Sequence, residues 1–180
     1  MQFTKIIKKE LPVSLEIARQ HLRVGDAAHD DALIAAKLEM AIGIAEDFTN
    51  RIIREQFVEF HVLLGEDSEE VRLPGHTSNV TGVSCLGNPI PDDKYEISLC
   101  EYEYKMTVDP EYAGKKLTVQ AIVGYSKETL PPAIQAAALM ILATLYDNES
   151  DNVVGRSVSR LSLTAEKLLR PWRLNPYGDV

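Results

Sequence analysis

Two stretches with helical periodicity enclose a middle with strand-like periodicity, and this order restricts the chain to few architectures. The first helical stretch covers residues 29–53 and the second covers residues 130–150. We therefore predict an α+β fold, a helical bundle carrying an inserted small antiparallel β subdomain. The predicted division is an N-terminal helical part at 1–54, a β-rich insertion at 55–128, and C-terminal helices with a tail at 129–180.

Four helices are expected, in the order short, long, long and short. Ser14 caps helix 15–22, helix 30–50 follows, a proline pair at Pro131 opens the third, and Pro171 stops the last. The third helix is apolar on nearly all sides, so we expect it to be central or to lie between subunits. Each long helix has an apolar stripe predicted to pack in the core or against another subunit: Ile34, Leu38, Ala41, Ala45 and Phe48 in the first, and Ile134, Ala138, Ile141 and Leu145 in the second.

The net charge of −8 is spread unevenly along the 180 residues. Residues 55–151 hold six basic and seventeen acidic side chains, or −11, whereas residues 152–180 hold five basic and two acidic, or +3. The acidic middle argues against tight nucleic-acid binding, which needs clustered Lys and Arg. No apolar run reaches the roughly 18 residues that a membrane span needs, so no membrane association is expected.

No convincing catalytic constellation is present, so we expect a structural protein and not an enzyme, with no cofactor and no metal. Four residues have the chemistry of metal ligands: Asp26, His29, Asp30 and Asp31. Their spacing matches no calcium loop. Carboxylates at the start of a helix are common because they interact favourably with the positive end of the helix dipole. The chain has no phosphate-binding glycine loop. Its two cysteines, Cys85 and Cys100, lie in strand-like runs and are read as buried free thiols, with a cross-strand pair as the alternative.

The basic C-terminal tail, residues 152–180, is more informative about function than the candidate metal ligands and the cysteines. It reads LTAEKLLRPWRLNP and places the only tryptophan beside two arginines and a leucine pair, a composition enriched in binding hot spots. The alternative is that Trp172 packs back on its own domain. The candidate docking residues are Leu168, Leu169, Arg170, Pro171, Trp172 and Arg173.

Several of these motifs together resemble a known family. A short helix ending HLRV, a long helix opening DDALI, and EDFTNRII before a strand resemble the head–tail connector (adaptor) proteins of tailed double-stranded DNA phages. LPPAIQAAALMILATLYDNES resembles the family's second signature helix, and LLRPWRLNP resembles its closing L-x-P-Y-R motif, with Trp172 where tyrosine is usual. The resemblance spans nearly the whole chain, but the β-rich middle is longer than in the shortest members.

The resemblance implies a virion protein of a phage or prophage, assembled in the host bacterial cytoplasm and located at the head–tail junction. It implies a homo-oligomeric ring, a dodecamer on the particle and a monomer in isolation, between the portal protein and a stopper or tail-completion protein. DNA would pass through the ring during packaging and ejection without sequence-specific binding. From its +3 balance and the LLRPWR cluster, we further predict that the C-terminal segment of this chain docks on the portal. The alternative is a tail or baseplate accessory module whose β domain binds carbohydrate or protein through Tyr95, Tyr102 and Tyr104.

Overall fold

The computed structural model describes residues 2–25, 30–65, 70–100, 103–148 and 162–174. Within this part of the chain it has four α-helices and two antiparallel sheets, which confirms the predicted α+β class. The chain folds as two compact units. The β unit is formed by Met1–Glu10 and Arg54–Tyr125, and the helical unit by Leu11–Ile53 and Ser126–Val180. Neither unit is continuous in sequence, so the chain passes from one to the other three times, after Glu10, Ile53 and Tyr125.

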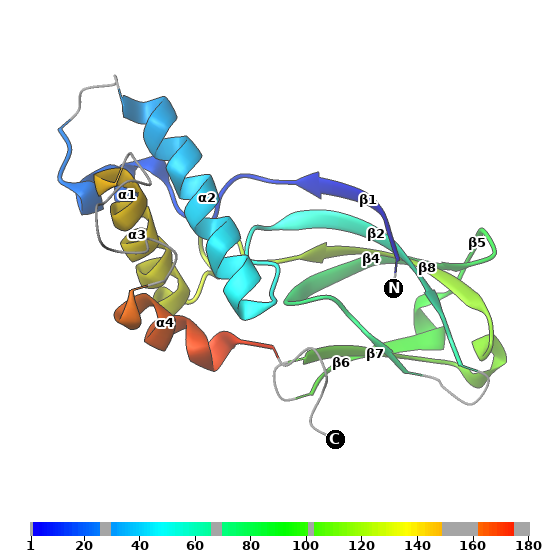
Figure 1. The fold of residues 1–180 in the computed structure, drawn as a ribbon. Helices are drawn as coiled ribbons and strands as arrows, with labels where there is room; N and C mark the ends of the chain where they lie inside the picture. The colour runs from blue at the N-terminus through cyan, green and yellow to red at the C-terminus, as the bar shows by residue number, and fades with distance from the viewer. Residues whose placement is uncertain (1, 26–29, 66–69, 101–102, 149–161, 175–180) are drawn as a thin grey trace. The chain divides into compact units, whose positions relative to one another are not determined.

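In its described residues, the helical unit contains four α-helices, and the 3₁₀ turn η4 follows the last of them (Figure 1). Ser14 Oγ accepts a hydrogen bond from the Ile17 amide at 3.3 Å, and Ser162 Oγ accepts one from the Ala165 amide at 3.2 Å, so serine side chains cap both short helices. The elements are α1 (Leu15–Leu22), α2 (Asp31–Thr49), α3 (Pro132–Asp147), α4 (Leu163–Leu169) and η4 (Arg170–Trp172).

Helix α3 is the centre of the helical unit and packs against α1, α2 and α4 of the same chain. Six of its residues are buried, namely Ile134, Ala137, Ala138, Leu139, Ile141 and Leu142, and its other apolar residues are half-buried. Of the predicted stripes, seven residues are buried and two, Phe48 and Leu145, are half-buried. The buried ones are Ile34, Leu38, Ala41, Ala45, Ile134, Ala138 and Ile141.

Two antiparallel sheets form the β unit, one with the strand order β1-β2-β8-β4-β5 and one with the order β3-β7-β6. Strands β2 and β8 form the middle of the larger sheet, and their alternate residues, including Val58, Phe60, Val119 and Ala121, are fully buried. The strand bounds are Gln2–Lys8 (β1), Gln56–Leu63 (β2), Glu70–Arg72 (β3), Thr77–Cys85 (β4), Asn88–Pro89 (β5), Tyr95–Cys100 (β6), Glu103–Val108 (β7) and Lys116–Val123 (β8).

Strand β1 differs from the prediction, which placed residues 1–54 together in a helical part. Residues 2–8 instead pair antiparallel with β2, at one edge of the larger sheet. Every residue of β1 is exposed, so it lacks the alternation of buried and exposed positions by which strands are recognised in a sequence. A register shift between Phe3 and Lys5 disturbs the period further.

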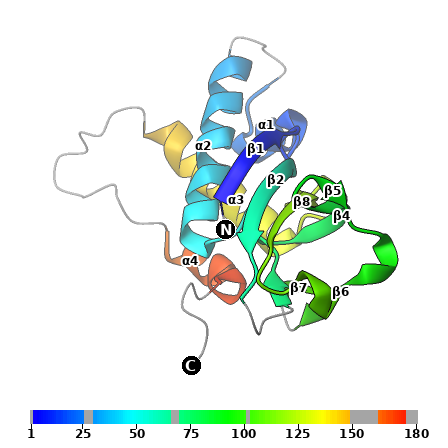
Figure 2. The same cartoon turned by 90° about the vertical axis from the view of Figure 1, so that its right-hand side faces the viewer.

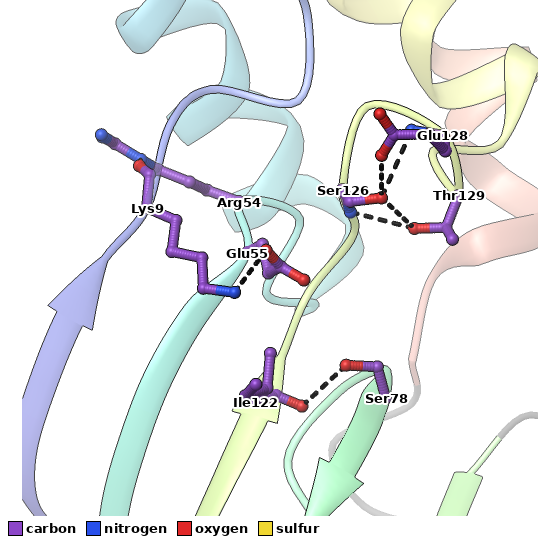
Figure 3. A network of polar contacts seen from close by, with 8 residues as sticks. All are labelled: Lys9, Arg54, Glu55, Ser78, Ile122, Ser126, Glu128 and Thr129. Carbon is purple, nitrogen blue, oxygen red and sulfur yellow. Dashed lines mark hydrogen bonds and ion pairs between the residues drawn. The ribbon is translucent and has the colours of Figure 1, made fainter.

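Polar contacts hold the backbone on each side of the passages between units (Figure 3). In the β unit, the Lys9 ammonium lies 2.9 Å from Glu55, and Arg54 Nε donates to the Lys9 carbonyl at 2.6 Å. In the helical unit, the Ser126 amide donates to Thr129 Oγ1 at 2.9 Å, and its hydroxyl donates to Glu128 at 2.7 Å. In each unit, the residues next to a passage are thus held by polar contacts within that same unit.

Candidate interaction surface

The C-terminal segment that the sequence singled out packs on the helical unit through part of its residues only. Leu169 is fully buried, as is Ala165 one turn earlier, and helix α4 packs against α3. Leu168 and Trp172 are half-buried, while Arg170, Pro171 and Arg173 are exposed. The six candidate docking residues therefore divide into a buried anchor, two intermediate side chains and three accessible ones.

Residues after α4 are held against the end of α2 by one backbone–backbone hydrogen bond and two from side chains to the backbone. The Leu174 amide donates to the Thr49 carbonyl at 2.8 Å, and Asn50 Nδ2 donates to the Leu174 carbonyl at 3.2 Å. Arg51, itself buried, donates through Nε to the Trp172 carbonyl. Asn50 adopts φ 53°, a left-handed helix end that turns its side chain toward this segment. The segment through Leu174 is therefore part of the fold of the helical unit.

The Arg173 guanidinium lies over the Phe48 ring, 5.7 Å from its centroid, so a cation–π contact positions this exposed arginine. Arg170 lies 3.9 Å from Glu166 one turn earlier on α4. An exposed ion pair of this kind contributes little stability and leaves the guanidinium accessible to a partner. Together with exposed Lys167, these arginines give the surface a positive charge.

The acidic residues at the start of α2 bind other side chains of the helical unit. Asp31 forms a two-point ion pair with Arg19 of α1, and Asp30 accepts a hydrogen bond from the Tyr146 hydroxyl at 3.0 Å. Lys37 donates to the Leu145 carbonyl at 2.7 Å, which satisfies a carbonyl in the last turn of α3. Asp26 and His29 lie outside the described residues. The described carboxylates thus join the start of α2 to α1 and to the end of α3.

The histidines and cysteines of the β unit have ordinary structural surroundings. The His76 ring stacks on Tyr125 at 4.5 Å between centroids and meets Tyr104 edge-on at 5.4 Å. His61 Nδ1 lies 3.0 Å from the Thr118 hydroxyl. Cys85 is a buried free thiol, and the side chain of Cys100 lies outside the described residues.

The tyrosines of the alternative binding groove do not lie together. Tyr95 pairs with Val108 and Tyr104 with Leu99, so the two tyrosines are at opposite ends of the β6–β7 hairpin, roughly 13 Å apart along the strands. The Tyr95 hydroxyl donates to Asp92 at 2.8 Å, and burial together with this carboxylate raises the pKa of Tyr95. Tyr102 lies outside the described residues. Tyr95 and Tyr104 are therefore too far apart to line one aromatic groove.

Comparison with protein-family models finds no match, and comparison with curated proteins finds none either. Comparison of folds finds close similarity to chains of a gene transfer agent particle. In the neck of the empty particle, computed with C6 symmetry, the match has a TM-score of 0.74 at 16% identity and covers 98% of this chain and 99% of the other. The native virion gives 0.72 at 16% identity, and the native neck computed with C12 symmetry gives 0.68 at 15%, each with the same coverage. Over nearly its whole length, the chain has the fold of a chain from the neck of a gene transfer agent particle.

Proposed function

We propose that the chain is a structural subunit of a phage-type head–tail connector, which forms a ring below the portal and carries a docking surface for the stopper or tail. The similarity of fold to the neck chains carries this proposal, because it extends over 98% of this chain and 99% of the neck chain. Two of those neck structures were computed with C6 and C12 symmetry, which supports a ring of copies as the working assembly.

The portal contact is assigned to the exposed side of the C-terminal segment. Leu169 fixes the segment to the helical unit, while Arg170, Pro171 and Arg173 are accessible. Half-buried Trp172 lies between the two arginines and supplies the aromatic surface that binding hot spots favour. The partner surface should be acidic, since the accessible charges are positive.

Passage of DNA through the ring fits the acidity of the chain. Twelve copies at −8 each would carry −96, and a duplex has a phosphate charge about every 1.7 Å along its axis. An acidic lining would repel the duplex and keep it from adhering during ejection. A lining made mostly of lysine and arginine would contradict this part of the proposal.

Docking is tested with the double variant Arg170→Glu and Arg173→Glu, measured by co-sedimentation with the portal protein or with portal-bearing heads. We expect at least a tenfold loss of binding, about 1.4 kcal/mol, because two accessible charges are reversed at an electrostatically matched contact. Removing α4 would be a poorer test, because Ala165 and Leu169 belong to the core.

The matched control is Lys115→Glu with Lys116→Glu, which reverses two exposed charges in the β unit. Thermal unfolding of both variants shows whether the fold is intact. Unchanged portal binding by the folded arginine variant would refute docking through this segment. Absence of portal and major capsid genes next to the gene would weaken the connector assignment as a whole.

A further inference from the structure

The β unit has two long strands at sheet edges and two short ones. Strand β1, seven residues long, forms one edge of the larger sheet, and β6, six residues long, forms one edge of the smaller sheet. The opposite edges are β5, two residues including Pro89, and β3, three residues; β5 pairs only with Ser84 and Cys85 of β4, and the rest of β4 is interrupted by two register shifts. Short strands and proline are ordinary means of preventing an edge from pairing with another chain. β1 and β6 are longer and contain no proline; β1 carries lysines and one register shift, and its lysines disfavour pairing with a like strand but not with an acidic one.

Both long edge strands also expose apolar side chains. On β1, Phe3 is 41% exposed, Ile6 51% and Ile7 49%; on β6, Ile97 is 40% exposed and Leu99 59%. Ile6 pairs with buried Val58, and Ile97 pairs with buried Met106. Ile6 and Ile97 therefore lie on the core-facing side of their sheets, but at the edge, where each is only partly covered. Exposed apolar surface next to a long sheet edge is typical of an interface.

The charges of the two strands are complementary. β1 carries exposed Lys5 and Lys8, whereas β6 carries exposed Glu96 and begins just after exposed Asp93. Lys94 is bound to Asp109 at 2.9 Å and to Glu111 at 3.1 Å, and Lys105, which pairs with Ser98 of β6, is bound to Glu70 at 3.1 Å, so carboxylates offset both lysines. Two β1 strands would bring lysine against lysine, which disfavours pairing of like edges, while β1 against β6 joins opposite charges.

We propose that β1 of one copy adds to β6 of a neighbouring copy, so that the sheets of adjacent β units join through the backbone. The partner is a second copy of this chain, because the chain itself presents both complementary edges. In Figures 1 and 2, β1 and β6 lie on opposite sides of the β unit. Two different surfaces on opposite sides give head-to-tail association, the type of contact that closes into rings. This inference rests on the ring in the proposed function and names the contact that builds it.

The test uses two full-length copies joined by a flexible Gly/Ser linker, which raises the effective concentration of the second copy to the millimolar range. Amide hydrogen exchange is followed by mass spectrometry. In the tandem protein, one β1 and one β6 should exchange at least about tenfold more slowly than in the single chain. Reversing β1 (Lys5→Glu, Lys8→Glu) or β6 (Asp93→Lys, Glu96→Lys) in both copies should abolish this protection, and combining the two reversals should restore it.

The control is again Lys115→Glu with Lys116→Glu, which should leave the protection unchanged, and slow exchange in central strands β2 and β8 shows that each variant is folded. Equal exchange of β1 and β6 in the tandem and single proteins would overturn the proposal, as would failure of the combined reversal to restore protection. Portal binding is measured separately. Unchanged portal binding by the Arg170→Glu, Arg173→Glu variant, with the strand protection intact, would contradict docking through the C-terminal segment and leave the strand contact standing.

Discussion

Both units bury a core and leave some apolar side chains exposed, among them Met40 at 56% and Leu163 at 76% in the helical unit, but helix α3 differs from the edge strands of the β unit in how it is covered. In the helical unit, α3 is apolar on nearly every side, and α1, α2 and α4 of the same chain pack against it, so that its apolar residues are buried or half-buried. In the β unit, the edge strands have fewer apolar residues but leave Ile6 and Leu99 more than half exposed. The amount of apolar surface in an element therefore does not locate an interface. What locates it is whether the chain supplies its own neighbour for that surface.

The largest contrast should appear between Leu142→Ala in the helical unit and Leu99→Ala in the β unit. Leu142 is fully buried, so its truncation should lower the free energy of unfolding by about 2–5 kcal/mol through lost transfer energy and a cavity. Leu99 is 59% exposed, so its truncation should change stability by no more than about 0.5 kcal/mol. Urea unfolding of both variants measures this. Equal losses would remove the distinction between the two units.

A second contrast lies within the β unit, between Gly124→Ala and Gly87→Ala. Both glycines have positive φ, 92° and 86°, so alanine at either should cost about 1–2 kcal/mol of backbone strain. A Cβ at Gly124 would also lie 2.4 Å from the Arg54 carbonyl oxygen, where the backbone must shift, whereas at Gly87 it would meet nothing within 4 Å. Gly124→Ala should therefore be worse by roughly 1–3 kcal/mol. Similar free energies of unfolding for the two variants would mean that the backbone at Arg54 can move away from the new Cβ at little cost.

The smallest effect should come from Asp109, also in the β unit. The hydrogen bond from Lys94, then that from the Glu111 amide, lowers the pKa of Asp109 below its unfolded value. A carboxyl whose pKa is lowered by folding stabilises the protein above its unfolded pKa, about 3.9, and loses this contribution as the pH falls through the lower folded pKa. Asp109→Asn should therefore lower the Tm slightly at pH 7 and by less below about pH 4. A Tm difference independent of pH, or one matched by exposed Asp93→Asn, would contradict this.

The sequence predicted most of the helical unit because its signals are local. The spacing of Ile34, Leu38, Ala41 and Ala45 has the helical period, and all four residues are buried. Ser14 and the prolines at 131 and 132 mark helix starts through hydrogen-bond chemistry within one turn, and α1 and α3 begin next to them. Such signals depend on neighbours in sequence and can be recognised without knowledge of the fold.

The signals that were missed depend on partners distant in sequence. Strand β1 could not be recognised because its residues are exposed on both faces, and only its pairing with β2, more than fifty residues later, makes it a strand. The division of the C-terminal segment into an anchor at Leu169 and accessible arginines was also hidden, because it depends on how α4 meets α3. The docking role of that segment stays a prediction.

The threefold passage of the chain between units has a consequence for the order of events on the ribosome. All strands of the β unit have been synthesised by Val123, before α3 begins at Pro132. The β unit can therefore fold while α2 still lacks its main packing partner, and the helical unit is finished only after α4 emerges. A chain that ended between these points would contain a folded β unit and an apolar helix α2 without its main packing partner. Exposed apolar surface of this kind is recognised by chaperones and proteases.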